Sequence, residues 1–522
     1  MLFRSGEGTI TTTGAISGGN DVNVTTASGA INIGSEAGNG NVTANNNINI
    51  DTNAGDITLN GKVNSINGFT HIAAGTYDDT GVTTDDKGNV TVNGEIASGD
   101  EVIVNAVNGS ITVNGTTTAN NGNVETTVNG DGNINLNGTV TASGDVTATV
   151  TGKGNIITGN KASVSGTDII FTTNDGDITT GSDLTAYKNV DLNVNTGNIT
   201  FGGDVTANDG NITIDITGDG DLKDAEKADN TLTAKGQEGS EDSGNIIINL
   251  KGAGDVDLYD LYATNNARLD IANGNLTLHE INGELVAMQL RTEGREMDVD
   301  KITAGTQIVL TGSDMSLDNI AQRPDADGML VVTPDGAQAD KPIDNFTIGN
   351  IQTNAGSGIR FDRLWVNNSD IHISEGQLWF DKLYVENMAH FSNSNMVAGI
   401  YGVPPVRDGS DSVYWINTSE NRPDSDLQAW QAGAGDWMYL RFTDDAIQES
   451  NGILLTLDEY DYVYDQRFTA EDHLRYQHGR YLDEDYKQAY GYGVSLHNRY
   501  GLIDYQDFTE ENAGEDEIAV EA

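Results

Sequence analysis

The chain has 522 residues and a formal net charge of −52, because 79 Asp and Glu outnumber 27 Lys and Arg. A negative field of this size repels nucleic acids and anionic membrane surfaces, which excludes nucleic-acid binding as a function. The sequence contains no cysteine, which excludes disulfides, thiolate catalysis and Cys-ligated zinc, and it contains no run of 18 apolar residues to predict a membrane-spanning helix.

A unit of about 22 residues recurs along the chain, and each copy contains an aliphatic-x-aliphatic pair that leads into a turn. Successive pairs begin at Ile111, Ile134, Ile156, Ile178 and Ile199, which are 23, 22, 22 and 21 residues apart. A fixed period of this length is typical of stacked repeat proteins, which lengthen by adding repeats.

Within each period, Gly is followed by Asn or Asp and then by Val or Ile, as in Gly122-Asn-Val124 and Gly176-Asp-Ile178. Between these signals the apolar residues alternate with polar ones, as in Val146–Val150, which predicts short strands with one buried face and leaves no room for helices. Winding each period into one coil lets equivalent strands pair in parallel. We therefore predict an all-β fold, a right-handed parallel β-helix with a small C-terminal β or α+β module.

Asn residues recur at the turns, at Asn60, Asn93, Asn114 and Asn137. Stacked Asn side chains form hydrogen-bonded ladders in cross-β structures, and the same ladder is one interpretation here. The other is that each Asn tolerates a left-handed backbone at an Asn-Gly turn. The two interpretations are compatible.

Composition divides the chain into four parts. Residues 1–321 carry the regular coils, residues 322–345 form a Pro-containing loop insertion, and residues 346–402 form terminal coils with a bulkier core. Residues 403–522 form an aromatic-rich module that ends in an acidic tail. Polar insertions at 73–88, 223–243 and 322–342 are the predicted places for recognition, because insertions in solenoids are exposed.

One short segment concentrates carboxylates, namely Asp219, Asp221, Asp224 and Glu226. We predict no cofactor; Ca²⁺ is the one candidate, because oxygen ligands of this kind suit it. The spacing matches neither the EF-hand nor the Gly-rich Ca²⁺-binding repeat. A solvated acidic loop is the alternative interpretation.

Aromatic residues form a second candidate site. Trp365 and Tyr384 occupy equivalent positions in two related segments 19 residues apart, and Trp379 is close to them in sequence. In stacked coils Tyr384 would lie about 4.8 Å from Trp365, and exposed rings at this spacing would hold a sugar or an apolar side chain of a partner. The alternative is that the C-terminal module packs over the rings as a cap.

The Gly-Asn-Ile/Val and Ile-Thr-Leu-Asn-Gly phrases resemble the repeats of filamentous haemagglutinin-like adhesins, including the leukotoxin-type filamentous adhesins, over about residues 8–400. This resemblance implies export through the bacterial envelope, a long surface fibre and attachment to host cells, matrix or other bacteria. Such adhesins carry an N-terminal secretion domain that this sequence lacks. We therefore expect a C-terminal piece of a longer chain whose upstream repeats continue the stack.

These observations predict a non-catalytic adhesin shaft, extracellular or on the bacterial cell surface. Its expected partners are host-cell or matrix glycans or proteins, or other bacteria. The alternative is a carbohydrate-active β-helix enzyme, a polysaccharide lyase or hydrolase, which would cluster carboxylates on neighbouring coils. Because Asp and Glu are spread over turn positions throughout, the sequence nominates no catalytic residue.

Overall fold

The computed structural model describes residues 1–75, 77–78, 81–82, 87–226, 228–240, 242–326, 328–339, 341–354, 357–362, 364–374, 377–380, 383–393, 396–401, 414–417 and 455–457. Their regular secondary structure is entirely β-strand, without a helix in any of these ranges. They divide into two compact units, Met1–Asn273 and Gly274–Ala522. In each unit parallel strands stack as the coils of a solenoid, which confirms the predicted fold class. The hand of the coil stays a prediction.

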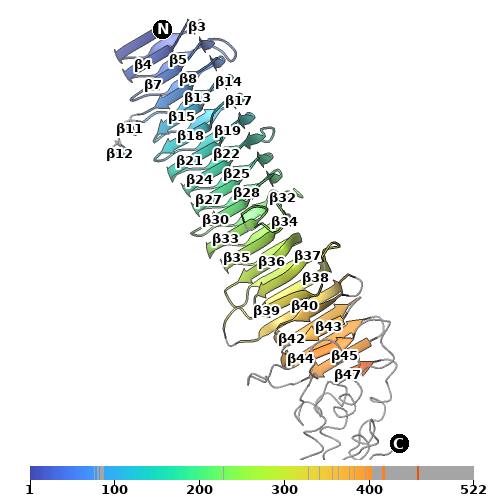
Figure 1. The fold of residues 1–522 in the computed structure, drawn as a ribbon. Helices are drawn as coiled ribbons and strands as arrows, with labels where there is room; N and C mark the ends of the chain where they lie inside the picture. The colour runs from blue at the N-terminus through green and yellow to red at the C-terminus, as the bar shows by residue number, and fades with distance from the viewer. Residues whose placement is uncertain are drawn as a thin grey trace, which may run out of the picture. The chain divides into compact units, whose positions relative to one another are not determined.

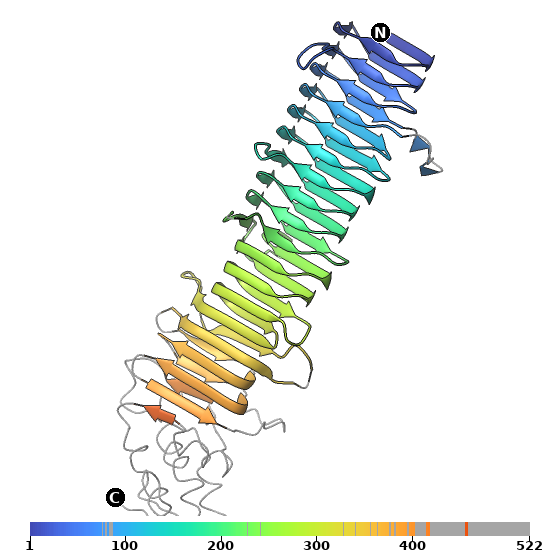
Figure 2. The same ribbon diagram turned by 180° about the vertical axis from the view of Figure 1, so that it is seen from behind.

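Each coil of the first unit contributes one strand to each of three parallel ladders, which lie on different sides of the stack (Figure 1, Figure 2). The long-strand ladder contains β1 (Leu2–Glu7), β4 (Val22–Ser28), β7 (Ile48–Thr52), β10 (Thr70–Ala74), β15 (Val102–Val107), β18 (Val124–Asn129), β21 (Val146–Lys153), β24 (Ile169–Asp175), β27 (Val190–Thr196), β30 (Ile212–Ile216), β33 (Ile246–Ala253) and β35 (Asn266–Asn273).

The other two ladders contain mainly three-residue strands. The anchor ladder contains β2 (Ile10–Thr12), β5 (Ile31–Ile33), β8 (Ile57–Leu59), β13 (Val90–Val92), β16 (Ile111–Val113), β19 (Ile134–Leu136), β22 (Ile156–Thr158), β25 (Ile178–Thr180), β28 (Ile199–Phe201) and β31 (Leu222–Asp224). The third ladder contains β3 (Ile16–Gly18), β6 (Val42–Ala44), β9 (Val63–Ser65), β14 (Ile96–Ser98), β17 (Thr117–Ala119), β20 (Val140–Ala142), β23 (Val164–Gly166), β26 (Leu184–Ala186), β29 (Val205–Ala207) and β32 (Thr231–Ala234). Within the first unit, β34 (Val256–Ala263) is the last strand of both ladders.

The aliphatic anchors of the repeat stack directly on one another. Along the anchor ladder, each of Ile111, Ile134, Ile156, Ile178 and Ile199 is the Cα partner of the next. All five side chains are fully buried. The stacking removes a continuous column of apolar surface from water, worth about 25 cal/mol for each Å² that is buried. The repeat period seen in the sequence is therefore the length of one coil.

The Asn residues of the turns form the predicted ladder. The Nδ2 of Asn93 donates to Oδ1 of Asn60 at 2.7 Å, and Asn114 and Asn137 repeat this bond to the preceding Asn at 2.8 Å. None of the four has a left-handed backbone, because Asn108 is the one non-Gly residue with positive φ in the described ranges. The ladder is confirmed, and the left-handed-turn interpretation of these four residues is wrong.

A second ladder involves the Asn or Asp that precedes each anchor strand. Oδ1 of Asn133 accepts the backbone N–H of Asn155 on the next coil at 2.8 Å, and Oδ1 of Asn155 accepts that of Asp177 at 2.8 Å. The series continues from Asp177 to Asn198 at 2.7 Å and from Asn198 to Asp221 at 2.8 Å. The Asn or Asp that precedes a long strand also accepts, through its Oδ1, the backbone N–H of the equivalent residue on the next coil. The Gly-Asn/Asp-aliphatic signal thus encodes a coil-to-coil hydrogen bond.

The glycines of the turns allow successive backbones to approach closely. A Cβ added to Gly115 would lie 2.1 Å from the carbonyl oxygen of Gly94, and one added to Gly138 would lie 2.1 Å from that of Gly115. Real side chains do not tolerate such distances, so glycine is required at these two turns.

The insertions contain more strand than the sequence predicted. In the segment 223–243, β32 pairs in register with β29, and Leu232 fills the core. In the segment 322–345, β39 (Leu330–Asp335) pairs with strands on both sides, and Val332 is buried. The prediction that these two segments are wholly loop is wrong, because each carries an aliphatic residue that completes a coil. In the segment 73–88, β11 (Tyr77–Asp78) and β12 (Gly81–Val82) form an antiparallel pair that stands away from the coils (Figure 1).

The second unit has longer strands. It contains β36 (Leu276–Leu290), β37 (Glu296–Thr311), β38 (Asp314–Gln322), β39, β40 (Ile343–Gln352), β41 (Gly358–Phe361), β42 (Leu364–Ile373), β43 (Gln377–Phe380), β44 (Leu383–Asn393), β45 (Met396–Tyr401), β46 (Tyr414–Asn417) and β47 (Leu455–Leu457). Strands β36 to β44 pair in parallel. The last three strands pair antiparallel, β46 with β43, β45 with β44 and β47 with β45.

The core of the second unit contains larger side chains, as the sequence predicts. Phe346 and Phe361 are fully buried and pack edge to face, with ring centroids 6.4 Å apart. Leu364 and Val366, on either side of Trp365, are buried as well. Most of the predicted module 403–522, including its acidic tail, lies outside the described residues.

Replacing a turn glycine tests the close approach of the coils. We expect Gly115→Ala to lower the free energy of unfolding of the first unit by about 1–3 kcal/mol, because its methyl group overlaps the Gly94 backbone. Gly14→Ala is the matched control, because nothing lies within 4 Å of its added Cβ. Urea denaturation measures both, and equal midpoints for the two variants would contradict the steric role of Gly115.

Replacing a ladder residue tests the coil-to-coil hydrogen bond. We expect Asn155→Ala to cost about 1 kcal/mol of stability and to speed amide exchange at Asp177, whose N–H loses its acceptor. Asn155→Asp keeps an oxygen at the same position, so we expect a much smaller loss and little change in exchange. Hydrogen exchange measured by NMR compares the two, and equal acceleration in both variants would argue against the oxygen acceptor.

Candidate functional site

The predicted aromatic site is brought together only in part. Trp365 and Tyr384 are Cα partners on β42 and β44, which confirms their equivalence. Trp379 lies on a different strand pair, opposite Arg360, and its other neighbour is Trp415 of β46. Trp365 is half-buried, and the side chains of Trp379 and Tyr384 lie outside the described residues. Strand β46 is added antiparallel beside β43, and the choice between a binding site and a cap at Trp365 and Tyr384 stays a prediction.

The predicted acidic site has two carboxylates that act in coil stacking. Oδ1 of Asp219 accepts the backbone N–H of Ala253 at 2.8 Å, and Oδ1 of Asp221 accepts that of Asp255 at 3.1 Å. Over the described ranges, no group of three or more His, Asp or Glu is arranged to hold a metal ion. Ca²⁺ binding by Asp219, Asp221, Asp224 and Glu226 therefore stays a prediction without a geometric match.

Asp224 has the most perturbed environment of the four. Its Oδ1 accepts Nδ2 of Asn230 at 3.0 Å, and its Oδ2 accepts the N–H of Tyr259 at 2.8 Å. Burial is the main reason that the pKa of Asp224 is raised to about 6. The two hydrogen bonds lower the pKa, and the negative charges of Asp257 and Asp229 raise it. This carboxyl group therefore titrates in a more alkaline range than an ordinary Asp.

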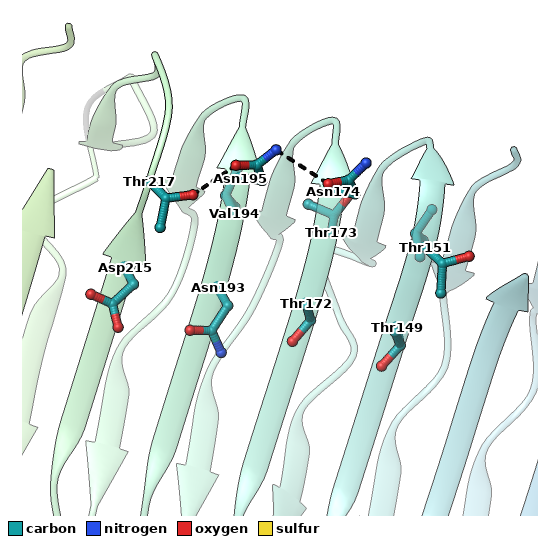
Figure 3. A pocket seen from close by; sticks show the side chains of 11 residues that line it. Thr149, Thr151, Thr172, Thr173, Asn174, Asn193, Val194, Asn195, Asp215 and Thr217 are labelled. Carbon is teal, nitrogen blue, oxygen red and sulfur yellow. Dashed lines mark hydrogen bonds between the residues drawn. The ribbon is translucent and has the colours of Figure 1, made fainter. Parts of the chain in front are cut away.

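A hollow that the sequence did not predict lies on the outer face of the long-strand ladder, with a volume of about 280 Å³. Thr149, Thr172, Asn193 and Asp215 form its floor, each from a neighbouring strand and each the Cα partner of the next. Figure 3 shows these side chains in one row across β21, β24, β27 and β30. We call this hollow the four-strand groove.

The rim of the four-strand groove is held by hydrogen bonds between side chains. Nδ2 of Asn195 donates to Oδ1 of Asn174 at 3.2 Å, and the hydroxyl of Thr217 donates to Oδ1 of Asn195 at 2.8 Å (Figure 3). The floor differs, because the side chains of Thr149, Thr172 and Asn193 make no hydrogen bond within the described part of the chain. The groove therefore presents free hydroxyl and amide groups to solvent.

One carboxylate lines the groove, and a second lies on the neighbouring strand outside its lining. Asp215 is on its floor, where Oδ1 accepts Nδ2 of Asn249 at 2.8 Å. Asp191 is the Cα partner of Thr213 on the same strand as Asp215. Burial raises the pKa of Asp191, and the negative charges of Asp168 and Asp215 raise it further. A hydrogen bond from Thr213 lowers the pKa in part. The groove thus has a negative electrostatic environment.

The sequence held only a weak signal for the groove. Its floor residues are the outward members of ordinary alternating strands, between buried residues such as Ala148, Val150, Phe171 and Leu192. The same alternation occurs on every coil. Only the register of the coils shows that free hydroxyl and amide groups follow one another in a row.

Comparison with known proteins gives no relative, because no family model, no curated protein and no solved structure matches the chain. Within the described residues, no helix has the length and apolar character to cross a membrane.

The raised pKa of Asp224 predicts the direction in which stability changes with pH. Its pKa of about 6 in the folded chain exceeds the ordinary value of 3.8, so between these values the folded state holds a proton that the unfolded state has lost. Stability contributed by this group therefore falls as the pH rises from about 4 to 6. We expect the stability of the native chain relative to Asp224→Asn to decline over this range.

Carbon-13 NMR of the carboxyl group measures the pKa directly. A value near 4 would contradict the effect of burial. The same titration tests the predicted metal site, because a Ca²⁺ ion bound at Asp224 would lower its pKa. An unchanged pKa in the presence of Ca²⁺ would rule out that ligand role.

Proposed function

We propose that the chain is a non-catalytic, surface-exposed adhesin shaft that mediates attachment to host cells, matrix or other bacteria. The observation that carries the proposal is the in-register stack of the first unit. Its aliphatic columns and Asn/Asp ladders make each coil the template for the next, so the structure lengthens by addition of repeats. This is the property needed to hold binding regions away from a cell surface.

The repeat phrases support the same proposal through their resemblance to filamentous haemagglutinin-like adhesins. Such a protein acts outside the cell or on the bacterial surface, where a fold without cysteine does not depend on the redox state. The antiparallel pair of β11 and β12 projects from the coils and offers one exposed place for recognition.

A second candidate function is supported by one observation, the carboxylates Asp191 and Asp215 on neighbouring strands, of which Asp215 lines the four-strand groove. Glycoside hydrolases use two carboxyl groups, one of which is protonated at the working pH. The raised pKa of Asp191 suits the protonated role. Incubation with polysaccharides, with reducing ends followed over time, separates this candidate from the adhesin.

Attachment tests the proposed function directly. We expect beads coated with the whole chain to attach to host epithelial cells, matrix-coated surfaces or bacteria well above beads coated with albumin, and we expect no reducing ends to be released from polysaccharides. Release of product that disappears in Asp191→Asn and Asp215→Asn would instead establish the enzyme. Attachment no greater than that of albumin beads on all three surfaces would contradict the adhesin.

A further inference from the structure

We propose that the four-strand groove binds an extended, uncharged polysaccharide whose chain runs across the strands with one sugar on each coil. This inference names a ligand class for the proposed adhesive function and rests on that function for its biological role. It is carried by the row of floor residues Thr149, Thr172, Asn193 and Asp215.

The hydrogen-bonding groups of the floor match a polyol. A hydroxyl donates one hydrogen bond and accepts others, and a carboxamide offers both donors and acceptors. Thr149, Thr172 and Asn193 have these groups free, while the methyl groups of the two threonines provide apolar contact for the C–H faces of a sugar ring. A ligand whose hydroxyl groups both donate and accept hydrogen bonds can replace the water that solvates the floor.

The geometry selects a chain with a short and regular repeat. Neighbouring strands lie about 4.8 Å apart, which is close to the length of one sugar ring along an extended polysaccharide. Four in-register floor residues therefore correspond to four successive sugars. Beyond Asp215, the next outward side chain is Asn249, which already donates to Asp215 at 2.8 Å and so ends the row of free groups.

The charges select against anionic ligands. The lining of the groove contains no Lys or Arg, and its one ionisable residue is Asp215. Asp191 lies two residues before Asn193 on β27, and burial raises its pKa, with smaller contributions from the charges of Asp168 and Asp215. An acidic glycan is repelled here. A polycation is attracted at long range, but it finds only one carboxylate on the floor, and that carboxylate is already bound by Asn249.

Titration with saccharides of defined length tests the proposal. The probes are uncharged gluco- and manno-oligosaccharides of two to six sugars, with oligogalacturonate and spermine as the anionic and cationic comparisons. Amide shifts are followed by NMR in the whole chain. We expect shifts in β21, β24, β27 and β30 for one uncharged series, with affinity that rises up to four sugars and then levels off, and we expect no such shifts with oligogalacturonate or spermine.

Matched variants locate the site. Thr172→Val removes a hydroxyl without changing the shape of the side chain, and we expect it to weaken binding roughly fivefold, the effect of about 1 kcal/mol for one hydrogen bond. Asn193→Ala removes the amide and should weaken binding at least as much. Thr185→Val is the control, because Thr185 is an exposed outward residue of β26 in the third ladder.

Three outcomes would overturn the proposal: no shift with any uncharged saccharide, equal loss in Thr185→Val and Thr172→Val, or stronger binding of oligogalacturonate or spermine. Its failure is distinguishable from failure of the adhesin. If coated beads attach but the groove amides do not shift, the groove proposal fails and the adhesin proposal stands. If the groove amides shift but the beads do not attach, the adhesin proposal fails and the groove proposal stands.

Discussion

Register between neighbouring coils is the constraint on which the first unit depends. A parallel strand that slipped by one residue would turn its aliphatic side chains outward and its polar ones inward. The same slip would move the oxygen of Asn155 away from the N–H of Asp177 and bring a side chain against the close turn of Gly115. Apolar burial, side-chain hydrogen bonding and turn sterics therefore all favour a single register.

The strict requirements of the interior leave the outward positions unconstrained. Backbone groups are satisfied by the neighbouring coils, and the aliphatic columns are buried within the stack. Outward residues such as Thr172 and Asn193 need only be compatible with a strand, so they are available for contact with a ligand. A solenoid of this kind separates the residues that maintain the fold from those that can recognise a partner.

Part of the acidity of the chain has a structural cause. Asp177, Asp183 and Asp221 each accept the backbone N–H of the equivalent residue on the next coil, a role that Asn fills on other coils. A carboxylate is a strong acceptor for an N–H group, so Asp and Asn exchange freely at these positions. Abundant Asp in the repeat is therefore poor evidence for a metal site or for catalysis.

The sequence by itself determined the coil length and the buried columns, because both depend on residues that recur at a fixed period, such as Ile111 and Ile134. It left the Asn ladder as one of two interpretations, and the structure decided it through bonds such as that from Asn114 to Asn93. It also identified the equivalence of Trp365 and Tyr384 from two similar segments. It missed the strands β32 and β39, because both lie in polar segments that lengthen the repeat, away from the regular period of the aliphatic residues. Only the tertiary structure decided the four-strand groove. Its floor joins residues about 22 positions apart whose types differ, and register rather than local pattern places them side by side.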